Sequence, residues 1–119
     1  MGLGSIAEER FMEILEKQFL ENLPLGIEVQ EVLFAGNIQG VAPFKSSFFT
    51  VQPGVTTPFD CHEVRELWLI VSGTGRVTCD KSVSEVKEKD AVYFDSFQRH
   101  SVENIGNTPL IIISIWWNP

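Results

Sequence analysis

The sequence predicts an all-β domain, a sandwich or a barrel of short strands, with one helix in front of it. From residue 27 onward the apolar residues fall into short runs that turn residues separate, and no helical spacing recurs among them. Many short strands at regular intervals, without helices between them, are typical of these two architectures. The 119 residues suit one compact domain, because two domains of half that length would each have too small a core to be stable.

The first expected element is an amphipathic helix over residues 5–23. Ser5 followed by Glu8 fits a capping box, in which the two side chains satisfy backbone N–H groups at the start of a helix. Apolar residues then recur on one face at helical spacing, with Glu and Lys opposite: Phe11, Ile14, Leu15, Phe19 and Leu23. Pro24 ends the pattern. We expect residues 1–25 to pack on the β-domain or on a partner subunit.

The β-domain is expected over residues 26–119. Its eight predicted strands are Ile27–Phe34, Ser47–Gln52, Leu67–Val71, Arg76–Cys79, Ser82–Val86, Ala91–Phe94, His100–Asn104 and Leu110–Trp117. Turn residues such as Gly106-Asn-Thr-Pro109 separate them. The last strand is apolar on both faces, which predicts either a central strand or one that a partner subunit covers, and we expect a homodimer.

Charge and hydropathy exclude several classes of partner. The net charge is −7, whereas nucleic acids and anionic membrane surfaces attract basic patches. Apolar runs such as Leu110–Ile113 are too short to span a bilayer, and the first residues lack the basic and long apolar parts of a signal peptide. We therefore expect a cytoplasmic protein with no nucleic-acid or membrane partner, and with Cys61 and Cys79 reduced.

The residues that carry chemistry lie around the only two histidines, His62 and His100. A single histidine at a strand edge is usually a surface residue, but carboxylates accompany the first of these. In an extended segment Asp60 and His62 share a face, and Glu66 follows a bend from which it can reach back toward that face. Converging carboxylates are costly unless they are solvated or bind a cation.

The spacing around both histidines resembles the paired motifs of the cupin superfamily, G-x5-H-x-H-x3,4-E-x6-G and G-x5-P-x-G-x2-H-x3-N. The first motif matches Gly54, Asp60, His62, Glu66 and Gly73, and the second matches Lys89, Asp95, Phe97, His100 and Asn104, with all spacings kept. This resemblance implies a cupin-type double-stranded β-helix, also called a jelly-roll barrel. It also implies that His62, Glu66 and His100 bind a metal ion.

The sequence departs from the cupin motifs at four positions. Asp60 stands where the family usually has its first histidine. Lys89, Asp95 and Phe97 replace the Gly, Pro and Gly of the second motif, so we expect this turn to be built differently. The fold implied by the resemblance tolerates these changes, whereas the role of Asp60 stays open.

Two versions of the metal site follow from this donor set. If Asp60 is a ligand, two imidazoles and two carboxylates surround the ion, which suits Fe, Mn, Zn or Ni. If Asp60 is not a ligand, the other three form a two-His, one-carboxylate face with open positions, which suits non-haem Fe(II). The alternative is a degenerate cupin whose pocket holds no metal.

We predict a small metal-dependent enzyme that acts on an organic acid, a sugar or a biosynthetic intermediate, as an isomerase, dioxygenase or lyase. Glu66, or Asp60, would move a proton. The alternative is a non-catalytic module that binds a sugar or another small molecule, or that accompanies a pathway enzyme. The pocket is expected to be lined by aromatic residues that could equally fill the core: Phe48, Trp68, Tyr93 and Trp116.

Overall fold

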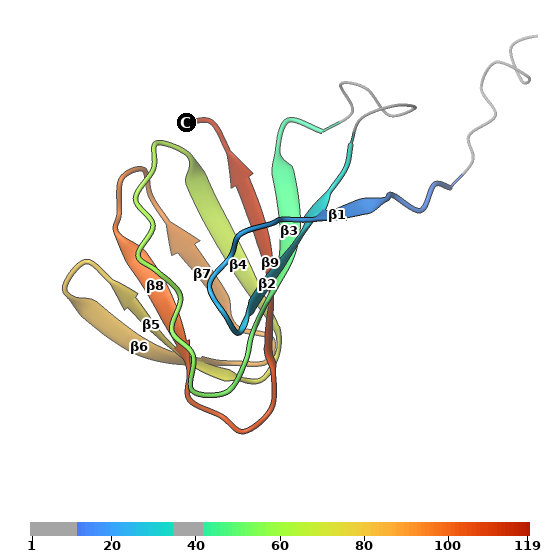
Figure 1. Cartoon of the computed structure of the whole chain (residues 1–119). Coiled ribbons are helices and arrows are strands. Elements are labelled where there is room, and N and C mark those ends of the chain that lie inside the picture. Colours follow the sequence, from blue (N-terminus) through green and yellow to red (C-terminus); the bar gives the residue numbers. More distant parts are fainter. Residues whose placement is uncertain (1–11, 35–41) are drawn as a thin grey trace, which may run out of the picture.

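The computed structural model describes residues 12–34 and 42–119, and these form two antiparallel sheets (Figure 1). The larger sheet has six strands in the order β1 (Lys17–Phe19), β2 (Ile27–Val32), β3 (Lys45–Val51), β9 (Leu110–Trp117), β4 (Arg65–Ser72) and β7 (Ala91–Phe94). The smaller sheet has three, in the order β6 (Ser82–Lys87), β5 (Thr74–Cys79) and β8 (His100–Asn104). All eight predicted strands are confirmed, and the all-β class with them.

The core lies between the two sheets and draws side chains from both. Phe49, Trp68, Phe94 and Ile112 come from the larger sheet, and Val77, Val86 and Val102 come from the smaller one. The indole of Trp68 is central, because its ring packs edge-on against both Phe49 and Phe94 at centroid distances of 5.2 and 4.7 Å. The alternation of the strands produces this arrangement, since every second residue faces inward.

The segment of residues 54–60, which is irregular, pairs with the free edge of β8 and so extends the smaller sheet. Backbone hydrogen bonds join Gly54 N to Asn104 O (3.0 Å) and Thr57 N to Val102 O (2.9 Å). Asp60 and His100 then exchange two bonds of 2.9 and 3.0 Å, as an antiparallel pair does. These two bonds fix Asp60 beside His100.

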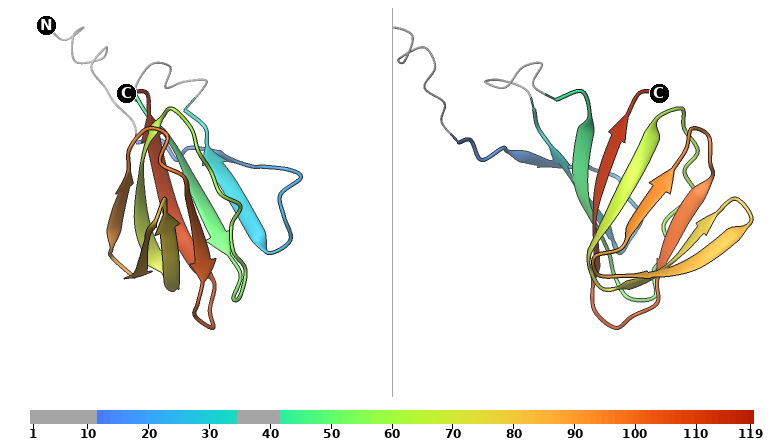
Figure 2. Two further views of the ribbon diagram at one scale, coloured as in Figure 1. Left: turned by 90° about the vertical axis from the view of Figure 1, so that its left-hand side faces the viewer. Right: turned by 180° about the vertical axis from the view of Figure 1, so that it is seen from behind.

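The helix predicted over residues 5–23 is wrong for the part that the structure describes. Residues 12–23 contain no helix, and Lys17–Phe19 instead form β1, which pairs with β2 and projects from the body of the domain (Figure 2). Residues 5–11 lie outside the described residues. The edge of β2 offers unpaired backbone groups, whereas a short isolated helix is marginal without packing. Ile14 and Phe19, which would have formed part of the apolar face, are 88% and 58% exposed.

Positive φ angles occur at four of the motif positions. Gly54 has a φ of 80° and Gly73 a φ of 93°, and a Cβ at Gly73 would lie 2.8 Å from the Leu110 Cα. Lys89 and Phe97, which replace motif glycines, have φ angles of 75° and 63°. Lys89 precedes β7 and Phe97 follows it, so two turns have the left-handed backbone that glycine favours. The expectation that the second motif is built differently here stays a prediction.

In the part of the chain that the structure describes, none of the elements is a helix long and apolar enough to cross a membrane.

Candidate metal centre

The structure brings together the four residues predicted for the site. Asp60 ends the irregular segment, His62 follows it, Glu66 lies in β4 and His100 begins β8. One potential ligand atom from each of Asp60, His62 and His100 lies within 4.8 Å of the others. The Oε1 atom of Glu66 is 3.2 Å from His62 Nε2 and 3.0 Å from His100 Nε2. Burial increases across the group, from the exposed Asp60 to His100, which is 2% exposed.

Backbone hydrogen bonds on two sides hold the group in place. Asp60 and His100 are directly opposed residues of a strand pair, so their side chains leave the sheet on the same face. The N–H of Phe97 donates to the carbonyl of His62 at 2.7 Å. The turn from Asp95 to Gln98 thus fixes the backbone of one histidine and leads directly into the strand that carries the other.

Both imidazole rings are oriented through their Nδ1 atoms. His100 Nδ1 lies 2.7 Å from the carbonyl of Gln98, and His62 Nδ1 lies 3.3 Å from the carbonyl of Val64. A carbonyl only accepts, so each Nδ1 donates a proton to it, and Nε2 of each ring is left for another partner. Both Nε2 atoms face Glu66 Oε1. This is the arrangement by which outer-shell carbonyls orient metal-binding histidines.

The donor set passes a test of fit for a divalent metal. A divalent cation can accept two imidazole nitrogens and a carboxylate oxygen together, and the negative charge of the carboxylate favours it. Two ligand atoms bound at right angles about 2.1 Å from one ion are about 3.0 Å apart, and the observed separations from Glu66 Oε1 are 3.0 and 3.2 Å. Imidazole nitrogen and carboxylate oxygen suit Fe, Mn, Zn or Ni. The residues fit the metal that the fold implies.

The second oxygen of Glu66 is committed to other partners. Glu66 Oε2 accepts hydrogen bonds from Trp68 Nε1, at 2.8 Å, and from the hydroxyl of Ser114. Burial raises the pKa of Glu66, but hydrogen bonds from His100, Ser114 and Trp68 outweigh it and hold that pKa below the ordinary value of 4.5. The carboxylate is therefore ionised and turned so that Oε1 faces the histidines.

His100 is enclosed more tightly than the other three residues. Its ring stacks on Phe94 at a centroid distance of 4.1 Å, and the ring of Trp68 meets it edge-on. Burial lowers the pKa of His100, but the hydrogen bonds to Glu66 and to the carbonyl of Gln98 outweigh it, so that the pKa lies above 6.5. Without a metal, a proton between His100 Nε2 and Glu66 Oε1 can supply the missing positive charge.

A cavity of about 380 Å³ adjoins the site. Asp60, His62 and Glu66 line it, together with Ser47, Thr57 and Ser114. Apolar residues form the rest of the wall: Leu20, Leu23, Pro24, Ile27, Val29, Phe49, Pro58, Val64, Trp68 and Trp116. The irregular stretch that follows β1 thus supplies part of the wall.

Of the four aromatic residues predicted for the pocket, the structure places Trp68 and Trp116 in the lining of this cavity. Phe48 and Tyr93 lie on the outer face of the larger sheet, where they are 37% and 51% exposed. The alternation of each strand explains this, because the neighbouring Phe49 and Phe94 face the core.

Sequence reasoning missed the residues that orient the site. Ser114 lies in the predicted strand Leu110–Trp117 without a predicted role in the site. A hydroxyl at an inward position of an apolar strand indicates a polar partner nearby, and this signal could have identified it. Gln98 acts through its backbone carbonyl, for which the residue type carries no signal.

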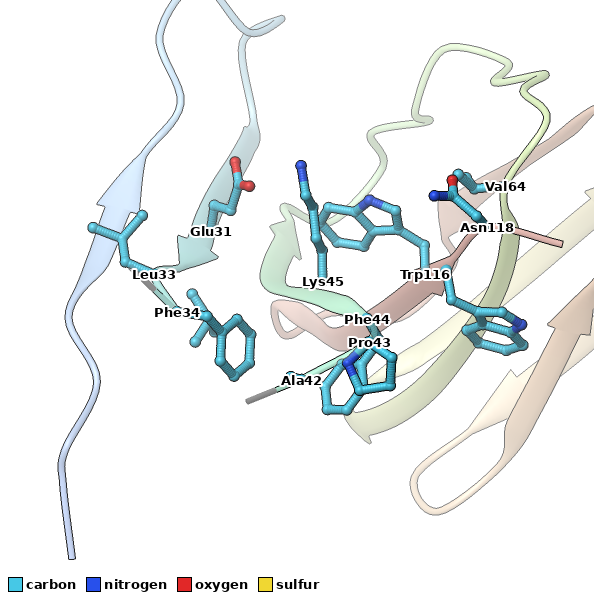
Figure 3. A pocket seen from close by; sticks show the side chains of 12 residues that line it. Glu31, Leu33, Phe34, Ala42, Pro43, Phe44, Lys45, Val64, Trp116 and Asn118 are labelled. Atoms are coloured by element: carbon cyan, nitrogen blue, oxygen red, sulfur yellow. The ribbon is translucent and has the colours of Figure 1, made fainter. Parts of the chain in front are cut away.

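Figure 3 shows a second pocket, of about 460 Å³. Phe34, Phe44, Lys45 and Glu31 contribute to its lining. Trp116 and Val64 line both pockets and so form the wall between them.

Comparison with known proteins places the chain in a family. Residues 47–116 match the model of the Cupin domain. A putative mannose-1-phosphate guanylyltransferase of Vibrio cholerae is 37% identical over 73 residues, which is 60% of this chain and 16% of that protein. The alginate biosynthesis protein AlgA of Pseudomonas putida is also 37% identical over 73 residues, 60% of this chain and 15% of that protein. The match therefore spans about a sixth of the length of these curated relatives.

Solved structures show the same fold over most of the chain. A Cupin 2 conserved barrel domain protein from Salinispora arenicola superposes with a TM-score of 0.73 and 26% identity, covering 92% of this chain and 91% of that one. A predicted oxalate decarboxylase from Thermotoga maritima superposes with a TM-score of 0.72 and 21% identity, covering 88% and 94%; this second likeness concerns the fold alone. With more than half of its residues inside the family match, this chain belongs to the cupin family.

Proposed function

We propose that this protein binds one divalent transition metal, Fe, Mn, Zn or Ni, through His62, Glu66 and His100, with Asp60 as a fourth ligand. One observation carries the proposal: the Nε2 atoms of both histidines converge on one oxygen of a buried carboxylate. A divalent cation bound by these three atoms would be held by rings that backbone carbonyls already orient.

The adjoining cavity supports a role in binding a small organic molecule. A metal here would act as a Lewis acid toward an oxygen atom of that molecule, or activate O2 if it is iron. In the version of the site in which Oε1 of Glu66 does not bind the metal, Glu66 is proposed as the catalytic residue that holds or returns a proton at that atom, because its Oε2 is committed to Trp68 and Ser114. Asp60, exposed and lining the same cavity, is the second carboxylate able to accept a proton. These roles fit an isomerase, an oxygenase or a lyase.

A non-catalytic binding module is the second candidate. It is favoured by the relatives, in which the matching region is only about a sixth of a longer protein. Their names concern mannose 1-phosphate and alginate, which raises a sugar or sugar phosphate as the ligand. Screening the metal-loaded protein for turnover, alongside Glu66→Gln, separates the candidates: a binding module shows no turnover that depends on Glu66.

Elemental analysis of the purified protein tests the metal site. We expect about one transition metal per chain in the wild type, and its loss in His62→Ala and in His100→Ala. Glu63→Ala is the matched control, because Glu63 is an exposed acid next to His62 that does not belong to the group. A metal content that neither histidine substitution changes would place the metal elsewhere.

We also propose that the protein is a cytoplasmic homodimer that pairs through the outer face of the larger sheet. The outward residues of β9, Ile111, Ile113 and Ile115, are only half-buried, and the exposed Phe48 and Tyr93 lie on the same face. The central position of β9 explains its inward apolar residues but leaves the outward ones without cover. Sedimentation analysis should show a dimer in the wild type and a monomer in Ile113→Lys; a monomeric wild type would contradict the proposal.

A further inference from the structure

The chemistry of the cavity wall points to the class of ligand. We propose that the cavity takes an uncharged, largely apolar molecule that offers one or two oxygen atoms to the metal, and that it excludes phosphate esters. The inference deepens the proposed function and rests on it for the metal. It also makes a statement about the cavity that is testable without the metal.

The first argument is the charge of the site. None of the described residues that line the cavity is lysine or arginine, and its ionisable side chains are Asp60, His62 and Glu66. Two carboxylates and two neutral imidazoles around a divalent ion sum to no net charge. Apart from the proposed metal, a phosphate group would enter without a guanidinium, an ammonium or a helix N-terminus to receive it. Beside two carboxylates, those missing donors would leave its loss of hydration only partly compensated.

The second argument is the supply of hydrogen bonds. Of the hydroxyls in the lining, Ser114 donates to Glu66, and the Oγ of Thr57 accepts from the N–H of Val102 at 3.0 Å. Ser47 is the third hydroxyl. With the Asp60 carboxylate as a further acceptor, the wall still offers fewer free partners than a sugar ring has hydroxyl groups, and each unpaired buried polar group is costly.

The third argument is the apolar remainder of the wall. Leu20 and Leu23, from the stretch after β1, stand with Val29, Phe49 and Trp116 around the same space. A volume of about 380 Å³ exceeds the roughly 150 Å³ of an apolar cavity that holds benzene. A ligand with one ring and a short oxygen-bearing chain therefore matches both the size and the polarity of the site.

A matched pair of probes tests the inference. Benzoylacetone carries an uncharged β-diketone on a phenyl ring, and phenyl phosphate carries a phosphate on the same ring. Isothermal titration of the metal-free and the Zn-loaded protein is expected to give at least tenfold tighter binding of benzoylacetone in both forms. Equal or tighter binding of phenyl phosphate to either form overturns the inference.

Substitutions in the wall locate the binding. Leu20→Ala and Leu23→Ala should each weaken the binding of benzoylacetone about tenfold, because each removes apolar contact with the ring. Ile14→Ala is the control: it lies in the same N-terminal stretch, is 88% exposed and does not line the cavity, so binding should not change. Wild-type affinity in both leucine variants would overturn the inference. None of the three side chains belongs to the buried core, so the fold is kept.

Measuring the metal content of the same samples separates this inference from the proposed function. If the wild type takes up no metal yet the metal-free protein prefers benzoylacetone, the proposed metal site fails and the character of the cavity is upheld. If the metal is present but phenyl phosphate binds as well as benzoylacetone, the ligand class fails and the metal site is upheld.

Discussion

Replacing Ser114 by alanine is the most selective test of how the metal site is held. The hydroxyl of Ser114, in the strand next to β4, donates a hydrogen bond to Glu66 Oε2. The Ser114 side chain forms no hydrogen bond with His62 or His100. Ser114→Ala therefore leaves every proposed ligand in place. It removes one of the two donors that turn Glu66 Oε1 toward the metal, and Trp68 remains as the other.

The expected loss of metal affinity follows from the role of Ser114 as an outer-shell partner. Removing such a partner typically weakens metal binding about 10- to 100-fold, which corresponds to about 1.4–2.8 kcal/mol. The metal-free protein should also lose stability. The lost hydrogen bond goes to a charged group and Ser114 is 3% exposed, so the free energy of unfolding should fall by about 1.5–3 kcal/mol.

Ser46→Ala is the matched control for this experiment. Ser46 is also buried, and its hydroxyl donates to the backbone carbonyl of Ser114 at 3.0 Å. The residue lies outside the cavity lining, so the substitution should cost about 0.5–1.5 kcal/mol of stability and leave the metal affinity unchanged. Competition with a chromophoric chelator gives the affinity, and urea unfolding in excess EDTA gives the stability. Equal metal affinities in the two variants would refute the view that Ser114 orients Glu66.

Three further predictions concern pH and the two turns. In the metal-free protein the pKa of His100 is raised above 6.5, so the stability that His100 contributes is complete below pH 6.5 and is lost as the pH rises through the folded-state pKa. The pKa of Glu66 is lowered below 4.5, so the stability that Glu66 contributes is complete above pH 4.5 and is lost as the pH falls through the folded-state pKa. Urea midpoints measured with EDTA should therefore be highest between these two values, and an unchanged pH profile in His100→Asn would contradict this origin. Lys89→Gly should raise the free energy of unfolding by about 0.5–1 kcal/mol, because the left-handed conformation costs lysine about 1–2 kcal/mol and the greater unfolded-state freedom of glycine cancels part of the gain; a lower urea midpoint would count against it. Gly73→Ala should destabilise the protein by more than about 2 kcal/mol, because the new Cβ would meet backbone atoms at 2.8 and 2.9 Å in addition to the strain of a φ of 93°; a midpoint within the error of the wild type would show that the turn can shift.

The strands were predictable because their pattern is local. The bounds of Ala91–Phe94, His100–Asn104 and Leu110–Trp117 agree with the structure, since alternation and turn residues mark both of their ends. The N-terminal stretch has an equally regular pattern, at helical spacing, but the helix that this pattern predicts is absent from residues 12–23. What decides that stretch is the free edge of β2, a feature of the assembled sheet that no local pattern contains.

The site was predictable as a set of residues but not as a geometry. Motif spacing predicted a site made of four residues, and in the structure they lie close together: Asp60, His62, Glu66 and His100. The hydrogen-bonded pairing of Asp60 with His100 joins segments forty residues apart in the chain. The donation from Ser114 likewise crosses 48 residues. Contacts at such separations depend on the sheet order, which the sequence alone leaves open.

The left-handed turn that contains Phe97 has a consequence beyond this chain. Its shape is kept by bonds on either side: Asp95 N donates to the side-chain oxygen of Gln98 at 2.8 Å, and Phe97 N donates to His62 at 2.7 Å. Residue identity at this place can therefore drift while the conformation is retained. A family signature that insists on glycine would pass over proteins of this kind, whereas one written in backbone angles would find them with their histidines intact.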